Sequence, residues 1–296
     1  MRQFGIIAAK EFSDRFRSGW VMACALVWLG AIALTSLFGL VQIGKIGVQG
    51  YERTVVSLLN LVQYLVPLLA LLLGHDLLVG EREEKTLALI LAGGVPRSRV
   101  LLGKFMGGCL TLAVPLTLGF TIAGTVIGLT AKDNGLVSFL KLALSGLVLG
   151  IIFLGLGLVI STLCRTRVQA LVLALLAWCA AVFVFDLAAM GLLVTTQSAQ
   201  AAREVEAATD ATHVNAMADI HAAFENGDDA AARIRGSTSK SMSSWLLINP
   251  VDLFRAINLP KELAPAVPPF AALLAIGLWL AGCLAVGIWK LNRIDL

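Results

Sequence analysis

Charged residues are scarce in this chain. They account for 14% of its 296 residues, against about 25% in an average soluble domain. Hydrophobic residues account for 58%. This balance excludes an ordinary soluble domain and indicates a membrane protein.

The motifs of several enzyme classes are also absent. The chain has no G-x-x-x-x-G-K-[ST] loop, which binds nucleotide phosphates, and no H-E-x-x-H motif, which binds zinc. Its five cysteines form no C-x-x-C pair and lie in or beside apolar runs, where they act as small hydrophobic residues. We therefore expect no disulfide framework, no catalytic centre and no cofactor bound by this chain.

Long apolar runs, by contrast, recur along the whole chain. A helix needs about 20 apolar residues to cross about 30 Å of hydrocarbon, and six runs reach that length. None alternates with period two, which excludes a spanning sheet. The sequence predicts an all-α membrane protein with six transmembrane helices, at Trp20–Val41, Val55–Val79, Gly107–Ala131, Leu136–Leu163, Val168–Thr195 and Phe270–Trp289.

Lysine and arginine are distributed unequally between the two sides of these spans. Thirteen lie on the side of the N-terminus: Arg2, Lys10, Arg15, Arg17, Arg82, Lys85, Arg97, Arg99, Lys104, Arg165, Arg167, Lys290 and Arg293. Four lie in the short loops opposite: Lys45, Arg53, Lys132 and Lys141. Because short cytoplasmic loops are enriched in these residues, both termini are predicted to be cytoplasmic. The first run is too long for a removable signal, so we expect it to stay as a span.

Residues 1–19 precede the first span and are predicted to form an amphipathic helix on the cytoplasmic membrane surface. Phe4, Ile7, Phe12 and Phe16 recur at helical spacing, with the charged residues mostly on the rest of the helix. An extended first span with charged flanks is the alternative.

The largest polar segment, residues 196–267, separates the fifth span from the sixth and is predicted to face outward. Its first half is rich in Ala and Glu and ends at Asn226-Gly227, which indicates a long helix stopped by a turn. Its second half is apolar but interrupted by prolines, so we expect it to lie on or dip into the outer membrane surface. The predicted divisions are 1–19, 20–195, 196–267 and 268–296, the last holding the sixth span and a cytoplasmic tail.

One charged stretch interrupts the apolar chain on the cytoplasmic side. Residues 80–104 read GEREEKTLALILAGGVPRSRVLLGK. Acids at the start of a helix are favoured by the helix dipole, so Glu81–Ala92 is predicted to be a short helix that ends at Gly93-Gly94. The stretch is either a rigid lever between two spans or a set of solvated loop charges that fix the topology.

The order of its motifs resembles the membrane subunits of type-2 ATP-binding-cassette exporters. These motifs are G-E-x-E-x-x-T-L, then a Pro-x-x-Arg turn and a Leu-Gly-Lys return to the membrane, and the layout of the whole chain fits as well. The resemblance implies a homodimer of this chain with two cytoplasmic ATPase subunits that use ATP and Mg²⁺. It also implies an inner-membrane location, no nucleic-acid partner, and a coupling segment at 80–100 that contacts the ATPase. The coupling residues would be Glu81, Arg82, Glu83, Glu84, Lys85, Arg97 and Arg99.

Two further stretches resemble one branch of that family. INPVDLFRAINL at 248–259 and FVFDLAAMGLL at 183–193 are similar to permeases that serve copper-centre assembly in nitrous oxide reductase. This implies export of a sulfur species for a copper-sulfide cluster, together with a periplasmic partner. The partner contacts would be Asn249, Pro250, Asp252 and Arg255. The long charged helix around His213 departs from the pattern and puts that partner contact in doubt.

Two other features suggest alternatives. Asp186 lies inside the fifth span, where an acid costs roughly 2.5–3.5 kcal/mol unless it faces water or a polar interior; it is either part of a transport pathway or hydrated near the outer interface. His213 and Met217 are one helical turn apart and fit a soft metal ion, although a solvated helix face is the stronger interpretation and no metal site is predicted. A secondary transporter, or a membrane sensor using Asp186 and the outward loop, is the alternative function.

Overall fold

Every regular element in the described part of the chain is a helix. The computed structural model describes residues 2–41, 49–92, 95–130, 135–184, 187, 248–258 and 268–293. The elements are α1 (Arg2–Phe16), α2 (Gly19–Val41), α3 (Gln49–Gly74), α4 (Val79–Glu83), α5 (Thr86–Ala92), α6 (Arg97–Thr130), α7 (Gly135–Leu163), α8 (Arg167–Cys179), the π-helical turn η1 (Ala180–Val184), α11 (Pro250–Asn258) and α12 (Pro269–Asn292).

Five stretches of these helices are long and apolar enough to cross a membrane. They are Ser57–Glu83, Arg97–Thr125, Val137–Leu163, Arg167–Val184 and Phe270–Asn292. A sixth is reached if α1 and α2, which meet at an angle of 70°, count as one bent span. The prediction of an all-α membrane protein is therefore confirmed, with five to six candidate spans in the described residues.

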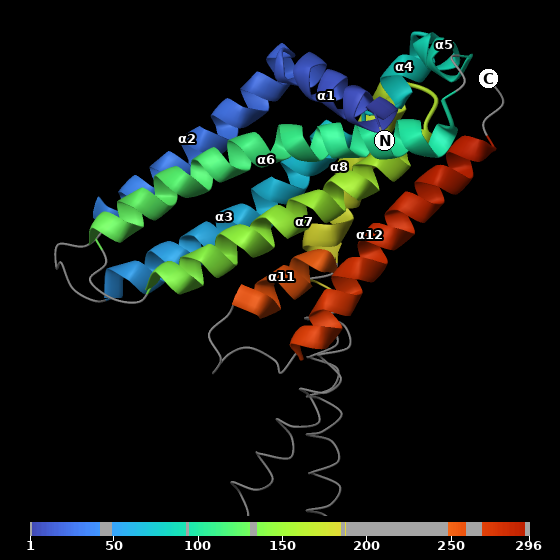
Figure 1. Cartoon of the computed structure of the whole chain (residues 1–296). Coiled ribbons are helices and arrows are strands. Elements are labelled where there is room, and N and C mark those ends of the chain that lie inside the picture. The colour runs from blue at the N-terminus through green and yellow to red at the C-terminus, as the bar shows by residue number, and fades with distance from the viewer. Residues whose placement is uncertain are drawn as a thin grey trace, which may run out of the picture.

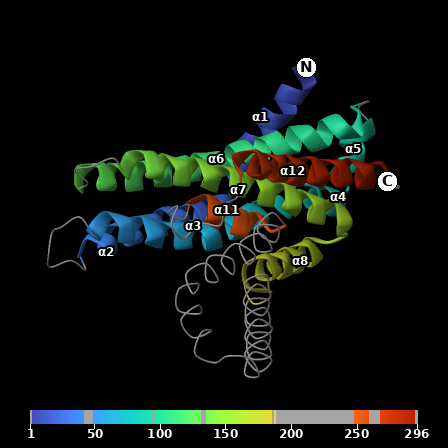
Figure 2. The same cartoon turned by 90° about the horizontal axis from the view of Figure 1, so that it is seen from below.

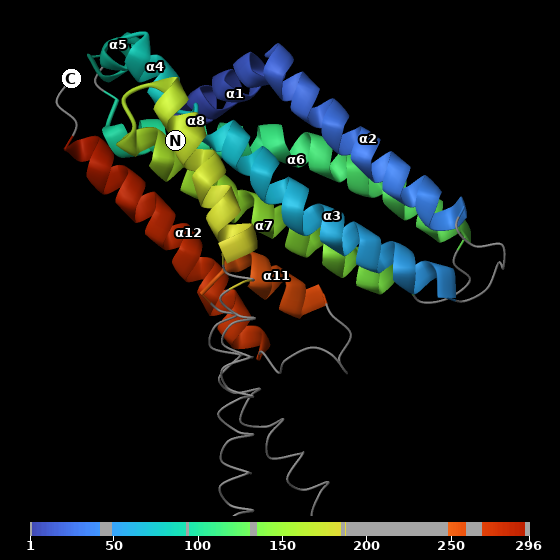
Figure 3. The ribbon, with the colours of Figure 1, turned by 180° about the vertical axis from the view of Figure 1, so that it is seen from behind.

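The core of the bundle is made by α2, α3, α6 and α7, which run side by side (Figures 1 and 3). Trp28 of α2 stacks edge-on against Phe120 of α6 at a centroid distance of 5.5 Å, and Phe120 meets Phe139 of α7 at 6.4 Å. α12 packs along α7 and α6, and α8 packs along α3 and α7 (Figure 2). Helices in a membrane associate through van der Waals packing, and large aromatic rings contribute much contact area to it.

Glycines set the closest helix contacts. A Cβ atom on Gly74 would lie 2.8 Å from the Cα atom of Gly157, so the backbones of α3 and α7 touch where these residues cross. Gly146 and Gly150, which share a face of α7 at four-residue spacing, pack against side chains of α3 and α6. Small residues at this spacing allow close approach without a side chain in the way.

The start of α1 and the end of α12 lie at the same end of the bundle as α4 and α5 (Figure 1). The last residues of α2 and α6 and the first residues of α3 and α7 lie at the opposite end (Figures 1 and 3). This arrangement places the charged stretch 80–104 beside α1 and the end of α12. The assignment of this end to the cytoplasm stays a prediction from the lysine and arginine distribution.

Candidate functional site

The charged stretch folds as two short helices rather than one. α4 ends at Glu83 and α5 begins at Thr86, and between them Lys85 has a φ of 59°. A non-glycine residue in this left-handed region costs of order 1 kcal/mol and persists only where surrounding contacts impose it. The single helix expected over 81–92 is therefore broken at Lys85, although its position between two spans is as predicted.

The first turn of α4 is capped by another helix. The hydroxyl oxygen of Ser161, near the end of α7, accepts hydrogen bonds from the backbone N–H groups of Leu78 and Val79, both at 2.9 Å. The N-cap residue of α4 is Leu78, whose apolar side chain cannot accept these hydrogen bonds. Because unsatisfied N–H groups at a buried helix start are costly, Ser161 fixes where α4 begins.

A buried cation joins α4 to α1. Lys104, in the second turn of α6, has a side chain only 3% exposed and lies 2.7 Å from Glu11 of α1 and 2.9 Å from Glu81 of α4. Arg15, on the next turn of α1, lies 2.5 Å from Glu11 and donates to the carbonyl oxygen of Leu73 at 3.1 Å. These ion pairs, with the hydrogen bond from Arg15 to Leu73, thus connect four helices: α1, α3, α4 and α6.

These cations also set the ionisation of Glu11, which precedes the spans. Burial by itself raises the pKa of a carboxyl group, but Lys104 and Arg15 outweigh that effect and hold the pKa of Glu11 below its ordinary value. Glu11 is therefore charged at neutral pH, as a buried lysine beside it requires.

A second, more exposed cluster joins α4 to α8. The guanidinium of Arg167 lies 3.2 Å from Asp76 and 3.8 Å from Glu83, and it contacts Glu84 closely. Its backbone N–H also donates to Glu83 at 3.2 Å. Arg82, on the same short helix, donates to the carbonyl oxygen of Cys164 at 3.2 Å. α4 is consequently tied to the end of α7 and the start of α8.

The turn after α5 is tied to the C-terminal helix. Arg97 donates to the carbonyl oxygens of Leu291 at 2.8 Å and Asn292 at 2.9 Å. A cation at the end of a helix satisfies carbonyls that have no helical partner and interacts favourably with the helix dipole. Arg97 therefore links the coupling segment to α12.

The seven coupling residues predicted from sequence divide into two groups. Contacts within this chain occupy Glu81, Arg82, Glu83, Glu84 and Arg97. Lys85 and Arg99 have exposed side chains, and Leu89 of α5, four residues after Lys85, is 74% exposed. Among the side chains of α5 that the structure describes, Leu89 is thus a large apolar one that faces outward. The residues that position this segment, Glu11, Asp76, Lys104, Ser161 and Arg167, were not predicted.

The four residues predicted to contact a periplasmic partner lie around the start of α11. Asn249 donates to the carbonyl oxygen of Ala181 in η1 at 2.8 Å and to Asp252 at 3.0 Å. Arg255 donates to Gln63 of α3 at 3.1 Å. Asn249, Pro250 and Asp252 are buried and Arg255 is half-buried. In the single chain they fasten α11 to the bundle, and the partner contact stays a prediction.

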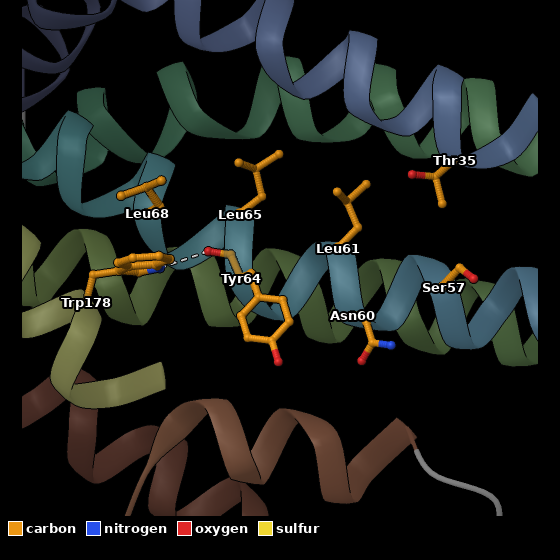
Figure 4. Close-up of a pocket in the computed structure, with 8 residues that line it drawn as sticks. All are labelled: Thr35, Ser57, Asn60, Leu61, Tyr64, Leu65, Leu68 and Trp178. Carbon is orange, nitrogen blue, oxygen red and sulfur yellow. Dashed lines mark hydrogen bonds between the residues drawn. The ribbon is translucent and has the colours of Figure 1, made fainter. Parts of the chain in front are cut away.

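A cavity of about 460 Å³ opens beside α3 (Figure 4). The indole of Trp178 in α8 closes one end and donates to the carbonyl oxygen of Tyr64 at 2.9 Å. The lining residues are Thr35, Ser57, Asn60, Leu61, Tyr64, Leu65, Leu68 and Trp178. Asn60 also accepts from Gln63 at 3.4 Å, which connects the cavity to the Arg255 contact of α11.

Several of the sequence predictions fall outside the described residues. These are the intramembrane acid Asp186, the two candidate metal ligands His213 and Met217, the end of the fifth predicted span and the long outward helix before Asn226-Gly227. Among the residues that the structure describes, no three His, Cys, Asp or Glu side chains are grouped to hold a metal ion.

Comparison with known proteins identifies the class of this molecule. The family model of the ABC-2 family transporter protein matches residues 6–296. The chain therefore belongs to the ABC-2 family of transporter proteins, and it is a multi-pass membrane permease.

Two curated relatives indicate which members of this family the chain resembles. The chain is 32% identical over 292 residues to the probable ABC transporter permease protein NosY of Pseudomonas aeruginosa, covering 95% of this chain and 92% of the relative. It is 31% identical over 264 residues to the protein of the same name from Stutzerimonas stutzeri, covering 88% and 82%. The chain is thus a NosY-like permease of the ABC-2 family.

Proposed function

We propose that this chain is the transmembrane subunit of an ATP-driven transporter and that a separate ATPase subunit attaches at α4 and α5. Membership of the ABC-2 family supports the transporter role. The observation that carries the attachment site is Leu89, which is 74% exposed on a helix outside the apolar bundle. A large exposed apolar side chain on a segment that also carries exposed cations is typical of an anchor that fills a pocket on a partner.

The contacts of this segment support a coupling role. α4 and its flanking residues, with Arg97 after α5, are bonded to α1, α6, α7, α8 and α12 through Lys104, Ser161, Arg167 and Arg97, and α5 packs against α4. A force applied at Leu89 would therefore reach several spans through α4. ATP and Mg²⁺ belong to the partner subunit in this proposal, since the chain lacks a phosphate-binding loop.

Exposed polar side chains within a candidate span support the homodimer. Ser57, Asn60 and Tyr64 are exposed along one face of α3, within a candidate span. Polar side chains in spans face a protein interior or a water-filled cavity rather than lipid. In the proposed dimer a second copy covers this face, and the cavity of Figure 4 lies between the two copies.

Similarity to NosY and the two stretches that resemble copper-assembly permeases support a proposal for the cargo. We propose that the transporter exports a sulfur species for copper-sulfide cluster assembly in nitrous oxide reductase, or acts mechanically on a periplasmic partner, from the cytoplasmic membrane of a bacterium with both termini inside. In this topology α1 lies at the cytoplasmic membrane surface. Its angle of 70° to α2 supports that placement.

The attachment is tested by purifying the tagged chain in detergent after coexpression with its ATPase subunit. Leu89→Asp with Lys85→Glu should abolish copurification of the ATPase, because it removes the apolar anchor and reverses a cation. Lys10→Glu is the matched control, since Lys10 is exposed on α1 at the same end of the bundle. Retention of ATPase by the double variant, or equal loss with Lys10→Glu, would contradict the attachment site.

A further inference from the structure

The acids Glu11 and Glu81 share Lys104 but are held unequally. Glu11 contacts two cations, Lys104 at 2.7 Å and Arg15 at 2.5 Å, and its side chain is 12% exposed. Glu81 contacts Lys104 at 2.9 Å, and its side chain is 25% exposed. Its second oxygen, Oε2, is buried and meets no hydrogen-bond donor among the described residues. Glu81 is therefore the less satisfied partner.

Near Lys104, α1 packs more closely than α4 on the backbone of α6. One turn further along α6, a Cβ on Gly107 would lie 2.6 Å from Cβ of Glu11 and 2.9 Å from the carbonyl oxygen of Ala8. α1 thus lies directly on the backbone of α6, in a contact that leaves no room for sliding. α1 and α6 form one rigid unit at this end of the bundle.

α4 has no comparable backbone contact with α6. Its first turn is held on α7 by the hydroxyl of Ser161, and its last turn is held on α8 by the exposed Arg167 cluster. The left-handed Lys85 then separates it from α5. Exposed ion pairs exchange partners at little cost, so α4 can rotate about Ser161 once the Glu81 contact opens.

We propose that Lys104 is a positioning residue that fastens α4 to the α1–α6 unit through Glu81, and that this ion pair opens when a partner displaces α4. The Glu11 contact is permanent and keeps Lys104 neutralised in both states. A buried lysine with a single acid would be left uncompensated on opening, which is prohibitive. Glu11 removes this cost, because it stays paired with Lys104 when the Glu81 contact opens. The fastening stands without any partner, whereas the opening step rests on the proposed function.

Hydrogen exchange of the full chain in lipid nanodiscs, without any partner, tests the fastening. In Glu81→Gln, the amides of Arg82 and Glu84, which bond to Leu78 and Gly80 within α4, should exchange about tenfold faster, the factor that about 1.4 kcal/mol of lost local stability gives. The amides of residues 5–16 should exchange as in the wild type. Lys104→Met should accelerate both segments.

Glu83→Gln is the matched control, because it removes the same charge from the same helix but from the exposed cluster. In this variant the exchange rates of the α4 amides should stay within about twofold of the wild-type rates. The proposal is overturned if Glu81→Gln leaves α4 unchanged, or if it accelerates residues 5–16 as much as α4. It is also overturned if Glu81→Gln fails to elute as a folded species, since a contact needed for folding is not one that opens.

The opening step is tested on the complex with the ATPase subunit, with and without a non-hydrolysable ATP analogue. The analogue should accelerate α4 exchange in the wild type and in Glu83→Gln, and should add nothing in Glu81→Gln, where the contact is already open. Equal acceleration by the analogue in all three forms would overturn this step. If no ATPase subunit copurifies, the proposed function fails, while the partner-free measurement still decides whether Lys104 fastens α4.

Discussion

The two short helices that interrupt the spans, α4 and α11, are fastened by different chemistry. Besides the hydroxyl of Ser161, α4 is held by charges, with Lys104 facing acids of α1 and α4 and Arg167 facing acids of α4 and the turns on either side of it. α11 carries one ion pair, Arg255 with Asp252 at 3.7 Å, but its contacts with other helices are made mainly by side-chain amides, with Asn249 on a carbonyl of η1 and Asn258 on the hydroxyl of Ser145 at 2.8 Å. Charges suit an end of the bundle where water and a partner can replace a contact.

The side-chain amides that hold α11 suit its buried position. Amide and hydroxyl groups cost less than ions to bury in an apolar bundle, provided that each finds a hydrogen-bond partner. η1 contributes to this arrangement, because a π-helical turn departs from the regular i to i−4 pattern of bonding and the carbonyl of Ala181 accepts from Asn249 instead. α11 is therefore built to stay in place in conditions that loosen α4.

The largest effect is expected from Lys104→Met. It leaves Glu11 and Glu81 without their shared cation and should cost on the order of 3–5 kcal/mol, the usual cost of breaking a buried ion pair. The measurement is the thermal unfolding midpoint in nanodiscs. The triple variant Glu11→Gln, Lys104→Met, Glu81→Gln should recover part of the loss, since no acid is left without a cation and Arg15 keeps its bond to the carbonyl oxygen of Leu73. A wild-type midpoint for Lys104→Met alone would show that the charges do not hold α4.

An intermediate effect is expected from Asn249→Leu at the start of α11. It removes the donor to Ala181 and to Asp252, and should cost about 1–3 kcal/mol. The loss should be the same at about 50 mM and about 500 mM salt, because buried contacts are screened much less than exposed ones. Ile248→Leu, a conservative change at the half-exposed neighbouring position, is the control. A strongly salt-dependent loss would contradict the distinction between α4 and α11.

The smallest effect is expected from Arg167→Gln in the exposed cluster. Exposed ion pairs contribute about 0.2–1 kcal/mol, and salt screens them. The unfolding midpoint should fall slightly at low salt and match the wild type at high salt. Arg165→Gln, two residues earlier and also exposed, should have no effect at either salt concentration. A loss as large as that of Lys104→Met would mean that the two clusters around α4 are equivalent.

Sequence reasoning reached the class of fold but not the contacts of the site. Apolar length predicted the spans, because a membrane imposes it on each helix separately, and the motif order located the coupling segment. Glu81, Glu83 and Glu84 were predicted to dock on a partner, yet each contacts a cation of this chain. Glu11 carries the one signal that was available, an acid on the apolar side of the first helix beside Ala8 and Phe12.

The sequence by itself determined the membrane class, the all-α fold and the position of the charged interruption. These follow from composition and from local spacing, which act within one helix. Only the tertiary structure decided that Lys104 is buried between two acids, that Ser161 begins α4 and that Leu89 remains outward. Those facts depend on residues from helices far apart in the chain meeting at one point, and a charge has the same sequence signature whether it faces water or a buried partner.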